Sequence, residues 1–117
     1  METEPPTIEI RLSLEFQQSL RKLAKKYRNI RADLEPVIQE LQSGEFLGDR
    51  IQGLGSVVVF KVRVQNSDAQ RGKSGGYRLV YELRSPTLVA LLQIYSKSER
   101  EDIDADEIRS ILTQFDE

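Results

Sequence analysis

Three β-strand patterns follow one another in the second half of the chain, and they set the fold class. The segments are VVVFKVRV (57–64), YRLVYEL (77–83) and TLVALLQIYS (87–96). Each is rich in β-branched, aliphatic or aromatic residues and is bounded by polar or turn-forming residues, which is typical of strands. A short turn at 84–86 separates the last two segments, and the polar segment 65–76 separates the first two. Strands joined this closely pair antiparallel.

Helical patterns occupy the first half of the chain and its end. TIEIRL (7–12) alternates as a half-buried strand does, and an apolar stripe at helical spacing then predicts a helix capped by Ser13. A second helix is expected to begin at an N-cap at Asp33, so that Pro36 falls in its first turn. Few residues join the two helices, which favours an antiparallel hairpin. Asp104 can cap a last helix in the tail.

The expected order of elements is therefore β-α-α-β-β-β-α. This is an α+β fold with a small antiparallel-rich sheet and a helical hairpin packed on one face. The length of 117 residues fits one domain over 1–117, with a flexible leader over 1–6. Residues 45–56 are expected to form a glycine-rich loop.

The composition excludes several kinds of site. The chain has no cysteine and no histidine, so it has no disulfide, no thiol nucleophile and no histidine base or zinc ligand. No carboxylates are spaced as a metal site requires, so we expect no metal and no other cofactor. The acidic N-terminus lacks the features of a signal peptide, and no apolar run approaches the ~18 residues of a membrane span. We expect a cytoplasmic protein without membrane contact.

The small net charge of −2 conceals a strong asymmetry. Residues 50–100 carry nine Lys or Arg and three Asp or Glu, whereas residues 101–117 carry one Arg and seven acids. A basic middle in an acidic chain indicates a local anion-binding surface, although a solvated charged surface is the simpler alternative.

The run GKSGG (72–76) resembles the core of a phosphate-binding P-loop. That motif needs a glycine five residues before Gly72, and Ser67 stands there instead. A strand pattern follows the run, so no helix N-terminus is expected to face a phosphate. We therefore interpret the run as a hairpin loop leading into a basic strand. Arg71 and Lys73 in this loop are predicted to contact RNA, and the alternative is a flexible hairpin loop in which both are solvated.

Cations recur on one face of the first two strands. Lys61 and Arg63 are two residues apart and share a face, opposite the apolar residues of FKVRV. Arg78 can join them if the register of the next strand places it beside that pair. Clustered cations repel one another in an empty site and are stabilised by a polyanion. Ordinary surface cations on an amphipathic strand are the alternative. Tyr95, Lys97 and Arg100 follow the third strand, at a rigid strand end that suits binding or catalysis.

The combination of "GDRIQGLG" with "FKVRV…GKSGGYRLVYEL…LLQIYSKSERED" resembles the RelE/ParE superfamily of toxin–antitoxin toxins, and RelE-like toxins in particular, over roughly residues 10–113. The resemblance implies a microbial-RNase-like fold and a ribosome-dependent mRNA endoribonuclease that a cognate antitoxin neutralises. By matching position, it assigns Lys61, Arg63 and Arg78 to the scissile phosphate. Lys97 and Arg100 match a basic segment after the last strand.

The sequence departs from the RelE pattern at two positions. Ser98 and Asp104 stand where the family prototype has an arginine and a tyrosine. In metal-free cleavage the RNA 2′-OH attacks the adjacent phosphorus, so the protein supplies positioning, charge and proton transfer. Arg63 and Arg78 could neutralise the developing charge, and Lys61 could be the base. Lys97 or Tyr95 could protonate the leaving oxygen.

Two other functions fit parts of the pattern. A ParE-like inhibitor of DNA gyrase would share the fold without catalysis, and it would not need the three cations on the sheet. A non-catalytic RNA-binding domain would stack bases on exposed aromatic residues. Most aromatic residues here fit apolar core stripes instead.

Overall fold

A sheet of five strands, in the order β1-β5-β4-β3-β2, forms the centre of the molecule. The computed structural model describes residues 7–68 and 76–116. The predicted strands are present as β3 (Val59–Val64), β4 (Tyr77–Ser85) and β5 (Leu88–Ser96), and they pair antiparallel. The α+β fold class inferred from these three segments is confirmed.

Two shorter strands complete the edges of the sheet. β1 (Glu9–Leu12) lies parallel to β5, and the two-residue β2 (Asp49–Arg50) lies antiparallel to β3 within the segment expected to be a loop. Gly48 allows this approach: its φ is 98°, and a Cβ there would lie 2.4 Å from the carbonyl oxygen of Lys61. So short a strand has no pattern of its own, which is why the sequence did not reveal it.

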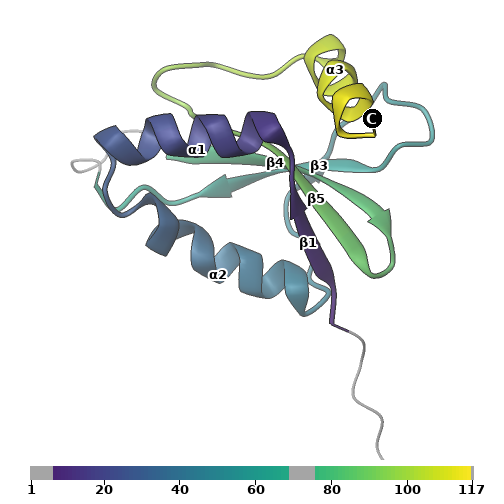
Figure 1. Ribbon diagram of the computed structural model, residues 1–117, viewed down its shortest axis with the longest axis horizontal. Helices are drawn as coiled ribbons and strands as arrows, with labels where there is room; N and C mark the ends of the chain where they lie inside the picture. The colour runs from purple at the N-terminus through teal and green to yellow at the C-terminus, as the bar shows by residue number, and fades with distance from the viewer. Residues whose placement is uncertain (1–6, 69–75, 117) are drawn as a thin grey trace, which may run out of the picture.

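Helices α1 (Leu14–Lys26) and α2 (Ile30–Gln42) run side by side in Figure 1 and form the predicted hairpin. Ser13 caps α1 as expected, because its Oγ accepts a hydrogen bond from the Phe16 amide at 2.9 Å. The expected N-cap of α2 at Asp33 is wrong, because α2 begins at Ile30 and its N-cap is Asn29, four residues earlier.

The early start of α2 has a packing reason. Ile30 is fully buried, and it extends the apolar stripe through Leu34 and Leu41 by one turn. Because Asp33 does not cap α2, its carboxylate is available to Ser67. It accepts hydrogen bonds from the amide and hydroxyl of Ser67, at 2.9 and 3.1 Å. Pro36 therefore lies inside the helix, on its exposed side.

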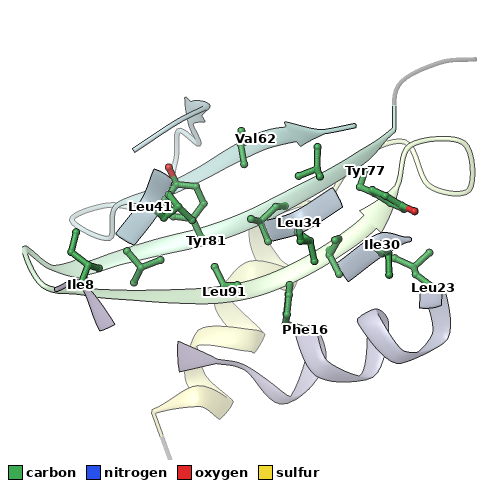
Figure 2. Close-up of a cluster of buried hydrophobic side chains, with 14 residues drawn as sticks. Ile8, Phe16, Leu23, Ile30, Leu34, Leu41, Val62, Tyr77, Tyr81 and Leu91 are labelled. Atoms are coloured by element: carbon green, nitrogen blue, oxygen red, sulfur yellow. The ribbon is translucent and has the colours of Figure 1, made fainter. Parts of the chain in front are cut away.

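The helical hairpin and one face of the sheet enclose the main hydrophobic core. Figure 2 shows side chains of α1 and α2, among them Phe16 and Leu34, meeting Tyr81 and Leu91 from the sheet. Phe16 is 1% exposed and Leu91 is fully buried. Burying side chains of this size supplies the main stabilisation of a small domain.

Helix α3 (Ala105–Phe115) covers part of the opposite face and lies apart from the hairpin in Figure 1. As predicted, Asp104 is its N-cap, with a carboxylate oxygen 2.8 Å from the Glu107 amide nitrogen. Ile108 and Ile111 pack there against Val59 and Val80. At the other end of α3, the Arg84 guanidinium lies 4.8 Å from the centre of the Phe115 ring. None of the helices that the structure describes is long and apolar enough to cross a membrane.

Candidate functional site

A row of polar side chains crosses three strands on the face that α3 covers only in part. Arg63 of β3 stands directly opposite Arg78 of β4, and Arg78 stands opposite Tyr95 of β5. Residues paired across antiparallel strands point to the same face, with Cβ atoms about 5 Å apart. The register therefore brings Arg78 beside Arg63, as the sequence argument required.

Lys61 lies two residues before Arg63 on the same face of β3, at the border of the second core. Its side chain is 30% exposed, and its Nζ donates a hydrogen bond to Asp102 Oδ1 at 2.6 Å. Arg63 is exposed and has no ion-pair partner within the described part of the chain. We call the surface formed by Lys61, Arg63 and Arg78, together with the adjoining and mostly buried Tyr95 (5% exposed), the basic face.

A β-bulge in β5 directs Tyr95 onto the basic face. Tyr81 pairs with Leu91 while Val80 pairs with Gln93, so Leu92 is an extra residue in the strand. Strict alternation would place Tyr95 on the same face as Leu91, under the helical hairpin. The bulge reverses this, and Tyr95 belongs to the second core instead.

Side chains satisfy the backbone groups that the bulge disturbs. Ser13 Oγ donates to the Leu92 carbonyl oxygen at 2.7 Å, and the Gln93 side-chain oxygen accepts from the Ile94 amide at 3.0 Å. Both side chains are buried, so these groups would otherwise lack partners. Ser13 thus links the start of α1 to the strand that carries Tyr95.

Two residues that follow β5, Arg100 and Asp102, contact Tyr95. Its hydroxyl donates to Asp102 Oδ1 at 3.3 Å, and the Arg100 guanidinium lies 5.3 Å from the centre of its ring. Burial, followed by the charge of Asp102, raises the pKa of Tyr95 to about 12. The phenol therefore keeps its proton at physiological pH and can act as a donor.

The two predicted cations after β5 are tied to the segment that follows them. Lys97 Nζ donates to the carbonyl oxygen of Glu101 at 2.7 Å. Arg100 forms an ion pair with Glu107 and donates from Nε to the Asp102 carbonyl oxygen at 2.9 Å. The hydrogen bond to Glu107 raises the pKa of Arg100. Lys97 and Arg100 thus bind the backbone of residues 101–102. Asp102 in turn contacts Lys61 and Tyr95 of the basic face.

A groove of about 230 Å³ leads from the basic face toward α1. Its floor includes Leu23 and Ile94, and Lys22 lines it together with Arg100. Tyr95 lines the groove as well, so the groove and the basic face adjoin at this residue. The carboxylate of Glu99 also lines the groove, which therefore carries charges of both signs at the end of β5.

The loop predicted to contact RNA lies mostly outside the described residues. Arg71 and Lys73 both fall in 69–75, outside the described residues. The element that follows is a strand, β4, as expected, and not the helix that a P-loop requires. Gly76 has a φ of 52°, and a Cβ there would lie 2.3 Å from the Val64 carbonyl oxygen.

The two positions that depart from the RelE pattern have structural partners. The Ser98 hydroxyl lies 3.0 Å from that of Ser96, and Asp104 caps α3. Tyr95 supplies an aromatic hydroxyl on the basic face.

Sequence reasoning missed Asp102, which contacts both Lys61 and Tyr95. These hydrogen bonds and one from the Ile103 amide lower the pKa of Asp102, the Lys61 bond most. The available signal was the acidic run that begins immediately after the basic strand end. Within the described residues, no three His, Cys, Asp or Glu side chains gather as a metal site would need.

Comparison with known proteins agrees with this architecture. The family model described as "RelE toxin of RelE / RelB toxin-antitoxin system" matches residues 16–114. The solved structure of an E. coli RelE toxin double mutant in the free state shares the fold, with a TM-score of 0.52 and 18% sequence identity. The match covers 92% of this chain and 95% of that one. No curated protein sequence is detectably similar to this one. The match of the family model over most of its length shows that this chain belongs to the RelE toxin family.

Proposed function

We propose that this protein is a toxin that cleaves mRNA on the ribosome in the cytoplasm and that a cognate antitoxin neutralises it. The observation that carries the proposal is the direct pairing of Arg63 with Arg78 across two strands. Like charges placed opposite each other destabilise a sheet, and a phosphate between them would reverse that effect. Arg can also bind two phosphate oxygens at once, which suits a scissile phosphodiester.

The proposed reaction needs no cofactor and no metal. The RNA 2′-OH attacks the adjacent phosphorus, a P–O bond forms, and the bond to the 5′-oxygen breaks. Arg63 and Arg78 stabilise the charge that develops on the phosphoryl oxygens. The protein supplies no nucleophile of its own, which accords with a chain that has no cysteine or histidine.

Proton transfer is assigned to the remaining polar groups of the basic face. In the empty site Lys61 Nζ is engaged by Asp102, because it donates a hydrogen bond to Oδ1. It can serve as the base once that bond is broken. Tyr95, which stays neutral at physiological pH, or Lys97 protonates the leaving 5′-oxygen. Such weak acids and bases require an RNA held in the reactive geometry, a task that falls to the ribosome.

Expression in a bacterial host tests this function. The wild type and Arg78→Ala are induced, and abundant mRNAs are examined by primer extension. We expect growth arrest with cuts inside translated reading frames, both lost in Arg78→Ala. Arrest without mRNA cuts would overturn the proposal in favour of gyrase inhibition. Absence of arrest at wild-type expression would leave a binding domain as the better interpretation.

A further inference from the structure

An acidic segment of this chain occupies the basic face. Residues 101–107, EDIDADE, contain five acids and no base. Four predicted site residues donate hydrogen bonds to this segment, through its side chains or its backbone. These four residues are Lys61, Tyr95, Lys97 and Arg100.

Asp102 makes the central contact. One carboxylate oxygen, Oδ1, accepts from Lys61 Nζ at 2.6 Å, from the Ile103 amide at 2.8 Å and from the Tyr95 hydroxyl at 3.3 Å. An ammonium, a phenol and an amide that converge on one anionic oxygen are the donors that a phosphate oxygen would use. The carboxylate therefore stands where an anionic ligand of the basic face would bind.

The chain holds Asp102 in this place from both sides. Ile103 is buried in the second core, and Asp104 caps α3. On the other side, Arg100 is fixed by its ion pair with Glu107. A tethered group acts at a high effective concentration, so it competes well with a ligand that arrives from solution.

The contact can nevertheless be broken at low cost. The Asp102 side chain is 60% exposed, and an exposed ion pair contributes little to stability. An RNA that another scaffold already holds against the basic face also has a high effective concentration. Such an RNA can displace Asp102 where freely diffusing RNA does so poorly.

We propose that Asp102 is an internal competitor for RNA phosphate at Lys61 and Tyr95, and that it selects RNA presented by a scaffold over free RNA. This inference rests on the proposed function for the identity of the ligand. It adds a residue that determines which form of the substrate binds. It also accounts for a carboxylate on a surface otherwise built to hold an anion.

The test compares Asp102→Asn with Asp106→Asn. Both variants remove one negative charge from the same segment, but Asp106 is 96% exposed and pairs only with Arg109 among the described residues. The probe is a short fluorescent 2′-O-methyl RNA, which the proteins bind but cannot cleave. We expect Asp102→Asn to bind it about three- to fivefold more tightly than the wild type, the range that an exposed ion pair supports. Asp106→Asn should change affinity by less than about 1.5-fold, because its charge is screened.

A third measurement links the effect to Lys61. In a Lys61→Ala background, Asp102→Asn should improve binding less than it does in the wild type, because Tyr95 is then the remaining one of the two competed side chains. Three results would each contradict the proposal that Asp102 competes with RNA phosphate. They are equal effects of Asp102→Asn and Asp106→Asn, weaker binding by Asp102→Asn, and no binding by any variant at low salt. Circular dichroism confirms that each variant is folded.

The outcome separates this inference from the endoribonuclease itself. Tighter binding by Asp102→Asn, together with intact mRNA on ribosomes for every variant, would support competition by Asp102 and contradict the proposed endoribonuclease activity. Cleavage on ribosomes with identical binding by Asp102→Asn and Asp106→Asn would do the opposite.

Discussion

The two faces of the sheet differ in how far helices cover them. Under α1 and α2 the cover extends along β3, where Val62 and Val64 are 9% and 1% exposed. On the face under α3, the same strand passes from the fully buried Val59 through Lys61 to the exposed Arg63. The candidate site thus lies where α3 no longer buries the sheet. The strands that carry it pack on their other face against the helical hairpin.

This arrangement gives the cations a fixed base. Arg63, Arg78 and Tyr95 stand on central strands and not on loops, so the hydrogen-bond ladder sets their spacing. Groups placed on strands are positioned more accurately than groups on loops. Changes on the first face should therefore affect stability, and changes on the basic face should affect activity.

The largest expected effect lies in the first core. Phe16→Ala removes a nearly fully buried ring between α1 and the sheet. We expect the free energy of unfolding to fall by about 3–5 kcal/mol, as for other large-to-small core substitutions. Urea denaturation measures this loss, and a change below about 1 kcal/mol would contradict the assignment of Phe16 to the main core.

Arg78→Ala should separate activity from stability. We expect cleavage to fall about 100-fold, the size found when one preorganised group that stabilises developing charge is removed. The free energy of unfolding should change by less than about 1 kcal/mol.

Rate and stability are measured on the same preparation, with Arg31→Ala on the exposed side of α2 as the matched control. A comparable loss of rate in Arg31→Ala would show that overall charge, and not the basic face, governs the reaction.

Ser13→Ala tests the connection between the faces. It removes both the cap of α1 and the hydrogen bond to the Leu92 carbonyl at the bulge. Asp104→Ala, which removes only a helix cap, is the control. We expect losses of about 2 kcal/mol and about 1 kcal/mol respectively, from thermal or urea unfolding. Equal losses would mean that the bulge does not depend on Ser13.

The smallest effect is a pH dependence due to Asp102. Its pKa is lowered in the folded protein, chiefly by the hydrogen bond from Lys61. The contact therefore stabilises the fold above the unfolded value of about 4, and the stabilisation is lost as the pH falls through the folded pKa. Because the side chain is 60% exposed, we expect less than about 1 kcal/mol.

Urea unfolding of the wild type and Asp102→Asn, compared at neutral and acidic pH, measures this term. The gap between the two proteins should narrow in acid, and a gap that widens would contradict the contact.

Local alternation predicted much of the basic face. A period of two residues was enough to place Lys61 and Arg63 on one face, and the register of β4 then placed Arg78 opposite Arg63. Tyr95 could not be placed in this way, because the extra residue Leu92 reverses the alternation. The capping group that stabilises this bulge, Ser13, lies 79 residues away in the sequence.

Contacts distant in the sequence account for the other differences. The α2 helix begins at Ile30 because tertiary burial outweighs the capping preference of Asp33. Asp102 meets Lys61 across 41 residues, and no local pattern encodes that pairing. The acidic run was visible as a charge asymmetry, but its place over the basic face emerged only from the fold.

Cleavage of mRNA by the purified protein would show whether the paired arginines of the basic face carry a ribosome-dependent activity. One mRNA is incubated with the wild type or an Arg63→Ala/Arg78→Ala double variant, either free or bound in programmed ribosomes. We expect cuts by the wild type in ribosome-bound mRNA, little cutting of free mRNA, and no cuts by the double variant. Equal cutting of free mRNA, or ribosome-bound cutting that survives the double substitution, would contradict this expectation.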